Sequence, residues 1–192
     1  IVSGALDTVD ADVRDVHAND PSAADAAAWR RRWARFGVIC DELSVSVLAL
    51  NVPAGGTNLM AGMLAEHDNV GMPVRLTLRQ LGDAELEVPP GTLVRICENP
   101  SVVAHAATTL EGDAAPLVCV EGQPNTAAIA LLDHLAADGC RFAYHGDFDW
   151  PGVAIASRVA ARFGARPWRM GPGDYVAAVR PDGPVLAGIP VE

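Results

Sequence analysis

The sequence predicts an α/β fold, in which a parallel β-sheet carries helices on both of its faces. Half of the 192 residues are hydrophobic and a fifth are charged, which is the composition of a folded domain. From residue 91 onward, short apolar runs alternate with stretches of helical periodicity. This alternation is typical of βαβ units, in which each helix connects two parallel strands.

The chain divides into three predicted regions. Residues 1–37 are expected to be the end of a longer N-terminal region with one helix, which Asp20 caps and Gly37 ends. Residues 38–90 are predicted to form a smaller, connecting α+β segment. Residues 91–192 are predicted to form the main α/β domain.

The α+β segment contains two strand-like runs. Apolar and polar residues alternate over 44–50 and 74–81, and a short helix is expected near 57–67 between them. Glycine, proline and acidic residues over 82–91 predict a loop and a boundary.

Four strands and three helices are expected in the α/β domain. The helix over 125–138 has the clearest signal, because its alanines and leucines recur on one face and Gly139 follows it. The helix over 150–163 begins at a Trp-Pro pair and ends before Gly164. The other expected elements are the strands 92–97, 116–120, 141–146 and 166–170 and the helix 101–110.

The chain is acidic, with a formal net charge of −10, and all 14 of its basic residues are arginines. The absence of lysine from these residues excludes a P-loop lysine and a Schiff-base lysine. The net charge opposes strong nucleic-acid binding, which therefore needs a local arginine surface, a metal ion or further segments. Arg166 and Arg169 are candidates for such a surface, whereas Arg158 and Arg162 fit better as exposed charge on a helix.

The four cysteines, Cys40, Cys97, Cys119 and Cys140, lack the spacing of a zinc site. We expect free, reduced thiols and a cytoplasmic location. No apolar run reaches the ~18–20 residues that a membrane-spanning helix needs.

Acidic residues follow three of the predicted strands: Glu98, Glu121, and the pair Asp147 and Asp149. Ligands of open parallel sheets bind at the carboxyl ends of the strands. Carboxylates gathered there repel one another unless a cation lies between them, and Mg²⁺ prefers such hard oxygen ligands. Each acid also has a structural interpretation, with Asp149 as a helix N-cap, Asp147 as a turn residue and Glu98 as a solvated strand end.

Three motifs carry a family resemblance. Residues 97–100 read Cys-Glu-Asn-Pro, residues 122–125 read Gly-Gln-Pro-Asn, and residues 144–152 read Tyr-His-Gly-Asp-Phe-Asp-Trp-Pro-Gly. A Glu after one strand and an Asp-x-Asp after a later strand resemble the Toprim fold of topoisomerases, primases and related nucleases. The third motif resembles that of the topoisomerase VI A subunit. Together with Leu-Thr-Leu-Arg-Gln-Leu at 76–81, the three motifs resemble the JetD-type subunit of bacterial Wadjet plasmid-defence systems, over residues 36–175.

The order of elements decides which glutamate matches the Toprim pattern. That fold has a strand ending in Glu, then a helix, a strand and a helix before the Asp-x-Asp strand. Starting at Glu98 reproduces this order, whereas starting at Glu121 leaves out one strand and one helix. We therefore expect Glu98 in the site and Glu121 at its rim.

The resemblance implies a metal-dependent DNA endonuclease. Asp147 and Asp149 would bind Mg²⁺ or Mn²⁺, and Glu98 would bind the metal or act as general acid or base. Asn99 and His145 would support them. The implied partners are DNA, subunits of an SMC-type ATPase complex and a second copy of the chain in a homodimer, with no membrane.

Three alternatives stay open. Topoisomerase VI-like enzymes use a tyrosine nucleophile from a separate domain, and neither Tyr144, within a predicted strand, nor Tyr175 fits that role, which favours hydrolysis over transesterification. The second alternative is a non-catalytic Toprim-like scaffold, whose acids cap helices. A Rossmann-like small-molecule site is disfavoured, because no G-x-G-x-x-G follows a strand.

Overall fold

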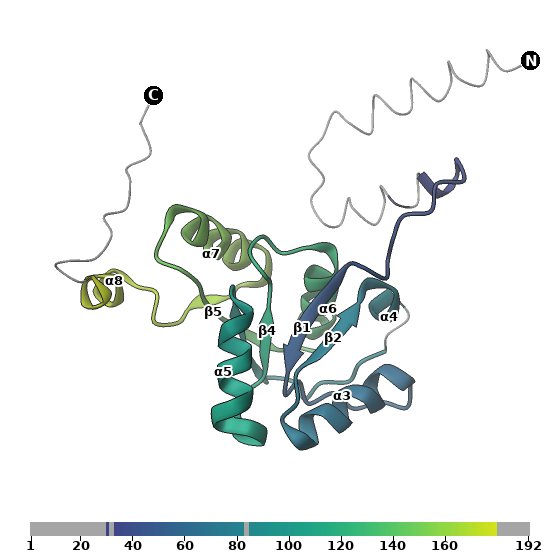
Figure 1. Ribbon diagram of the computed structural model, residues 1–192, viewed down its shortest axis with the longest axis horizontal. Helices are drawn as coiled ribbons and strands as arrows, with labels where there is room; N and C mark the ends of the chain where they lie inside the picture. Colours follow the sequence, from purple (N-terminus) through teal and green to yellow (C-terminus); the bar gives the residue numbers. More distant parts are fainter. Residues whose placement is uncertain (1–29, 31–32, 83–84, 180–192) are drawn as a thin grey trace, which may run out of the picture. The chain divides into compact units, whose positions relative to one another are not determined.

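The computed structural model describes residues 30, 33–82 and 85–179, and the chain forms two compact units, residues 1–41 and 42–192. The second unit contains a six-stranded sheet and its helices (Figure 1). Its strands are β1 (Ser46–Leu50), β2 (Val74–Thr77), β3 (Leu93–Cys97), β4 (Leu117–Cys119), β5 (Arg141–His145) and β6 (Arg166–Pro167). Its helices are α3 (Leu59–Val70), α4 (Leu78–Gly82), α5 (Pro100–Leu110), the 3-10 turn η1 (Glu111–Asp113), α6 (Thr126–Ala137), α7 (Trp150–Phe163) and α8 (Pro172–Ala178).

The sheet confirms the predicted α/β class, with an antiparallel part that joins the parallel one. Its strand order is β2-β1-β4-β3-β5-β6. The pairs β4–β3, β3–β5 and β5–β6 are parallel, whereas β1 runs antiparallel to both of its neighbours. The predicted 38–90 segment thus contributes β1 and β2 to the same sheet as the strands that follow residue 91.

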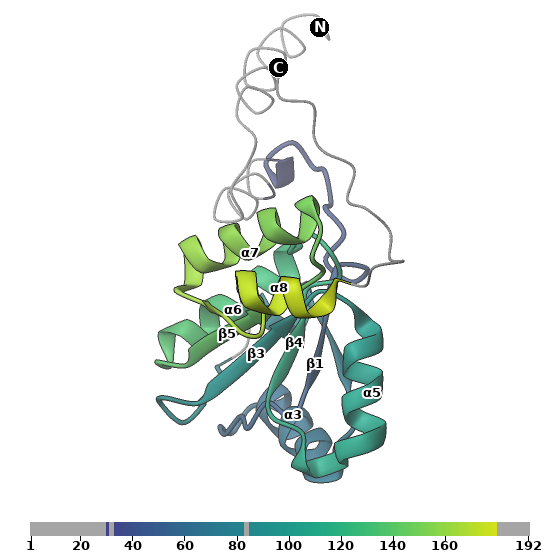
Figure 2. The ribbon, with the colours of Figure 1, turned by 90° about the vertical axis from the view of Figure 1, so that its left-hand side faces the viewer.

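Each face of the sheet has its own hydrophobic core. On one face, α3, α4, α6 and α7 pack on apolar residues such as Ile96, Val118 and Tyr144. On the other face, α5 packs on β1, β3 and β4, around Val103 and Cys119. Figure 2 shows α5 on one side of the strands and α6 and α7 on the other. Because side chains alternate along a strand, neighbours in sequence divide between the two cores.

The predicted strand 74–81 is wrong in its second half, where the chain turns into α4. The Gln80 side-chain oxygen accepts a hydrogen bond from the Thr77 nitrogen at 2.8 Å, and the Thr77 hydroxyl accepts one from the Gln80 nitrogen at 3.2 Å. This reciprocal pair is a capping box, which satisfies the free N–H groups of a first helical turn. The Thr-x-x-Gln spacing was the signal for it, and it overrides the strand-like alternation.

Most other expected elements are present, with shifts at their ends. The helix 150–163 has the predicted bounds, and the apolar face predicted for α6 is buried, with Ala128, Leu131, Leu132 and Leu135. The strand predicted over 166–170 shortens to Arg166–Pro167, and α8 was not expected. The start of the predicted helix at Asp20 lies outside the described residues. No helix in the described ranges is long and apolar enough to span a membrane.

Candidate functional site

Glu98 and Asp147 lie together at the carboxyl ends of two adjacent parallel strands. The register of β3 and β5 pairs Cys97 with His145, so that the residues after each strand emerge side by side. The Glu98 Oε2 atom accepts a hydrogen bond from the Asp147 backbone nitrogen at 3.4 Å. Two residues that are 49 positions apart in the sequence are thereby brought into contact.

Gly146 makes this contact sterically possible. A Cβ atom on Gly146 would stand 2.6 Å from the Tyr144 hydroxyl and 2.9 Å from the Glu98 Oε2 atom. Contacts this short do not occur in folded proteins, so only glycine fits here without displacing one of its neighbours. The glycine of the Gly-Asp-Phe-Asp motif is therefore required by the approach of Glu98 to the strand end.

Tyr144 places a buried hydroxyl beneath the two carboxylates. The residue is only 1 % exposed, and its hydroxyl has no hydrogen-bond partner among the described residues. Burial raises the pKa of Tyr144, and the negative charges of Glu98 and Asp147 raise it further. The hydroxyl therefore stays protonated, and it lies at the end of the sheet that carries Glu98 and Asp147. Sequence reasoning placed Tyr144 in a strand but assigned it no part in the site.

Asp149 serves as the N-cap of α7. Its Oδ1 atom accepts a hydrogen bond from the Gly152 backbone nitrogen at 2.7 Å. A Cβ atom on Gly152 would overlap the carbonyl oxygen of Asp147, so the loop between the two aspartates is tightly wound. The structural interpretation of Asp149 is thus present in the molecule, and one of its carboxylate oxygens is committed to the helix.

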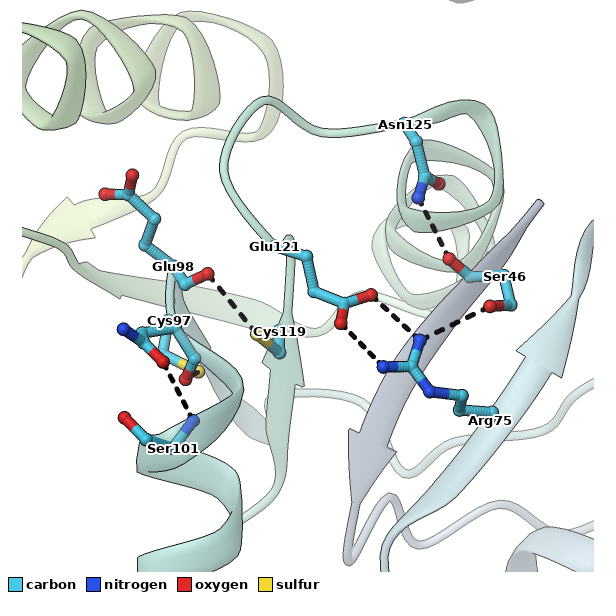
Figure 3. A network of polar contacts seen from close by, with 9 residues as sticks. Ser46, Arg75, Cys97, Glu98, Ser101, Cys119, Glu121 and Asn125 are labelled. Carbon is cyan, nitrogen blue, oxygen red and sulfur yellow. Dashed lines mark hydrogen bonds and ion pairs between the residues drawn. The ribbon is translucent and has the colours of Figure 1, made fainter. Parts of the chain in front are cut away.

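Asn99 also has a capping role. Its side-chain oxygen accepts a hydrogen bond from the Ser101 nitrogen at 2.9 Å, which makes it the N-cap of α5. The Glu98 carbonyl oxygen accepts a hydrogen bond from the Cys119 thiol at 3.5 Å (Figure 3). The backbone of Glu98 is therefore held between a neighbouring strand and the start of a helix, while its side chain stays half-buried.

Glu121 belongs to a different contact. Arg75 donates two hydrogen bonds to its carboxylate, at 2.6 and 2.9 Å, and Figure 3 shows its side chain directed at Arg75 and away from that of Glu98. The hydrogen bonds to Arg75 lower the pKa of Glu121, and the same contact raises that of Arg75. Glu121 has a backbone φ of 54°, a left-handed conformation that is uncommon for a residue other than glycine. Its charge is neutralised within the sheet.

His145 lies on the opposite face of β5 from Tyr144. Its Nδ1 atom is 3.0 Å from the Trp168 carbonyl oxygen, and its ring meets the rings of Trp168 and Phe148 edge to face. The ring of Phe148 in turn meets that of Tyr175 at a centroid distance of 5.6 Å. These aromatic rings border the loop that contains Asp147 and Asp149, which we call the aspartate loop. Of the residues that carry them, only His145 was a predicted site residue.

The donor atoms of Glu98 and Asp147 suit Mg²⁺ or Mn²⁺. Both are hard carboxylate oxygens, and Mg²⁺ commonly binds one or two carboxylates while keeping several waters. Within the described ranges, no three side chains of His, Cys, Asp or Glu are arranged to hold a metal ion. The printed contact joins Glu98 to the backbone nitrogen of Asp147, and Asp149 commits one oxygen to α7, so a metal held here would take most of its ligands from water and substrate.

One protein family matches this chain. Its description reads "Protein of unknown function C-terminus (DUF2399)", and the match covers residues 74–192, more than half of the chain. The chain belongs to the DUF2399 family. The DUF2399 match begins with β2 and contains Glu98, Glu121 and both aspartates. No curated protein and no solved structure matches the chain.

Proposed function

We propose that this DUF2399 chain is the Toprim-type subunit of a metal-dependent DNA endonuclease. The observation that carries the proposal is the contact of Glu98 with Asp147 at the ends of adjacent parallel strands. The neutralisation of Glu121 by Arg75 supports the same choice of glutamate that the order of elements made. The resemblance of the three motifs to JetD-type subunits supplies the reaction, phosphodiester hydrolysis.

Glu98 and Asp147, with Asp149, would hold Mg²⁺ or Mn²⁺. When bound, the metal polarises the scissile phosphate and stabilises the leaving oxygen, which contributes several kcal/mol. Glu98 would bind the metal or act as general acid or base, the role that the resemblance implies for it. The buried Tyr144 hydroxyl and the Glu98 carboxylate both border the space beside Gly146.

The acidic composition supports a role within a larger assembly. A formal charge of −10 opposes the approach of DNA, so affinity must come from a local surface or from other subunits. We propose that subunits of an SMC-type ATPase complex present plasmid DNA to this domain, and that the domain acts as a homodimer. Both proposals follow the resemblance to Wadjet plasmid-defence systems.

A second candidate is a non-catalytic scaffold of Toprim type. Two of the predicted site residues, Asp149 and Asn99, are the N-caps of α7 and α5, which is a sufficient structural reason for their presence. The contact of Glu98 with Asp147 satisfies one backbone N–H group, but it also gathers two acids at one edge of the sheet, which a scaffold does not require. For this reason we place the nuclease first.

The test is the linearisation of a circular plasmid by the full-length protein with its SMC-type partners. The proposal expects cleavage with Mg²⁺ or Mn²⁺ and none with EDTA. Asp147→Asn should reduce cleavage by orders of magnitude, whereas Asp133→Asn, the same change on exposed α6, should not. Metal-independent cleavage, or equal cleavage by both variants, would contradict the proposal and favour the scaffold.

A further inference from the structure

One half of a sheet face carries arginines that lack acidic partners. The strand register aligns Arg95 of β3 with Ala143 of β5 and Arg166 of β6. The three side chains therefore lie on one face of the sheet, in one row across the strands. The outer two backbones are about 10 Å apart, since neighbouring strands are spaced by about 4.8 Å. The small side chain of Ala143 lies between them.

Trp168 lies over this row. It follows β6, and its backbone nitrogen donates to the Tyr144 carbonyl oxygen at 2.8 Å. The guanidinium carbons of Arg95 and Arg169 are 5.3 and 5.2 Å from the centre of its ring. The ring stays 40 % exposed. We call Arg95, Arg166, Trp168 and Arg169 the arginine–tryptophan surface.

The charge of this surface is uncompensated. Elsewhere in the described chain, Arg75, Arg79 and Arg162 each form an ion pair with a carboxylate. Within the same described ranges, the three arginines of the arginine–tryptophan surface form none. Arg141 and Arg158 also lack an ion pair in the described chain, but they donate to the neutral oxygens of Gly91 and Gln123. The arginines of the arginine–tryptophan surface are distinct in that they gather at one place on the sheet, in a chain with 24 acidic and 14 basic residues. Like charges that gather without counter-charges indicate a binding site for an anionic ligand.

Backbone conformation contributes to the arrangement. Arg169 has a φ of 50°, a left-handed conformation that is costly for an arginine. This conformation occurs where Arg169 turns back over the ring of Trp168. Strain of this kind persists when surrounding structure holds it, and it is frequent in binding sites.

We infer that the arginine–tryptophan surface binds an unpaired strand of nucleic acid and leads it to Glu98 and Asp147. The cations lie on β3, on β6 and in the segment after β6, around an aromatic ring, which suits a chain of phosphates better than a single phosphate ion. An exposed ring beside arginines is the usual means of binding unpaired bases, because each base can stack on it. The bases of a duplex are already stacked and cannot do so.

The surface adjoins the loop that contains Asp147 and Asp149, through the ring contacts of His145 with Trp168 and Phe148. The His145 ring meets the ring of Trp168, and His145 immediately precedes the Gly-Asp-Phe-Asp segment. The exposed ring of Tyr175 extends the aromatic group past Phe148. The inference rests on the proposed function, because it specifies that a strand of the plasmid reaches the carboxylates once it is unpaired.

The test is fluorescence anisotropy of the full chain with a labelled mixed-sequence oligonucleotide, single-stranded or duplex, at low salt in EDTA. We expect tighter binding of the single strand. Arg95→Gln/Arg166→Gln should weaken it about tenfold or more and lower the salt slope by about 1.4, since each phosphate contact contributes about 0.7. Arg79→Gln/Arg162→Gln, with the same loss of charge elsewhere, should change binding less than about twofold.

Three results would overturn the inference: no binding by the wild type, tighter binding of the duplex, or equal weakening in both double variants. Because no metal is present, these results do not depend on metal binding by the carboxylates. Metal-dependent cleavage combined with normal oligonucleotide binding by Arg95→Gln/Arg166→Gln would reject the surface and leave the nuclease standing. The expected binding without metal-dependent cleavage would reject the nuclease and keep the surface.

Discussion

The Glu98 carboxylate accepts a hydrogen bond from the backbone nitrogen of Asp147, across the ends of two parallel strands. The neighbouring strand end carries Glu121, which is instead paired with Arg75. Two glutamates at similar places in the sheet therefore have different surroundings. One faces the aspartate loop, and the other is neutralised by an arginine from β2.

Gly146→Ala tests the close packing beneath this contact. The added Cβ would meet the Tyr144 hydroxyl and the Glu98 carboxylate, so we expect a loss of about 1–3 kcal/mol in the free energy of unfolding. Gly62→Ala in α3 meets no atom within 4 Å and should stabilise by about 0.5–1 kcal/mol, the usual gain within a helix. Urea denaturation measures the free energy of unfolding of both variants. An equal gain in this free energy in the two variants would show that Glu98 does not approach Gly146.

Asp149 allows capping and metal binding to be separated. Asparagine caps helices as well as aspartate does, so Asp149→Asn should keep the stability, whereas Asp149→Ala should lose about 1 kcal/mol. Both variants should lose metal-dependent plasmid cleavage if the carboxylate binds metal. Thermal unfolding and the cleavage assay together decide the point. Full cleavage by Asp149→Asn would restrict this residue to its capping role.

Tyr144→Phe should change the stability at alkaline pH. The folded state raises the pKa of Tyr144 above its ordinary value of 10, so the unfolded chain releases this proton first. The corresponding stability is complete below pH 10 and is lost as the pH rises toward the folded pKa, by about 1.4 kcal/mol per pH unit. Tyr144→Phe should lose stability less steeply above pH 10 than the wild type.

The matched control for this change is Tyr175→Phe, at an exposed ring, which should keep the wild-type slope. At neutral pH, Tyr144→Phe should be neutral or slightly stabilising, because the hydroxyl it removes has no partner among the described residues. Urea denaturation from pH 8 to pH 11 measures both effects. Identical slopes for wild type and Tyr144→Phe would contradict the burial of this hydroxyl beside Glu98.

Tyr175 separates hydrolysis from transesterification. Its ring meets that of Phe148, between the two aspartates, so it is the exposed tyrosine nearest to the site in the described chain. Hydrolysis requires no tyrosine nucleophile, and Tyr175→Phe should therefore keep full plasmid cleavage. Denaturing gels should show no protein attached to the DNA ends. A protein-linked end that disappears in Tyr175→Phe would assign a topoisomerase-like reaction.

The order of strands and helices after residue 91 could be predicted because its signals are local. The apolar face of α6 repeats every three to four residues, and Pro151 and Gly164 mark the ends of α7. The turn into α4 was local too, through Thr77 and Gln80, but it competes with an alternating apolar pattern. The antiparallel place of β1 between β2 and β4 depends on long-range pairing that no local pattern records.

The candidate site was predictable only in part. The places of Glu98 and Asp147 follow from chain order, because carboxyl ends of parallel strands meet at one edge. The pairing of Glu121 with Arg75 joins residues 46 positions apart and has no sequence signal. The same holds for Arg95, which only the strand register aligns with Arg166 across Ala143. The residues that end the strands of the site could be predicted from the order of elements along the chain. The residues that surround the site could not, because long-range strand pairing brings them there.

The most direct test of the central claim compares Glu98→Gln with Glu121→Gln, two equal changes of charge at neighbouring strand ends. The measurement is the rise in unfolding temperature of the full chain on adding Mn²⁺, since an ion that binds only the folded state stabilises it. We predict a rise for the wild type and for Glu121→Gln, and little or none for Glu98→Gln. A full rise in Glu98→Gln, or its loss in Glu121→Gln, would contradict the assignment of Glu98 to the metal site.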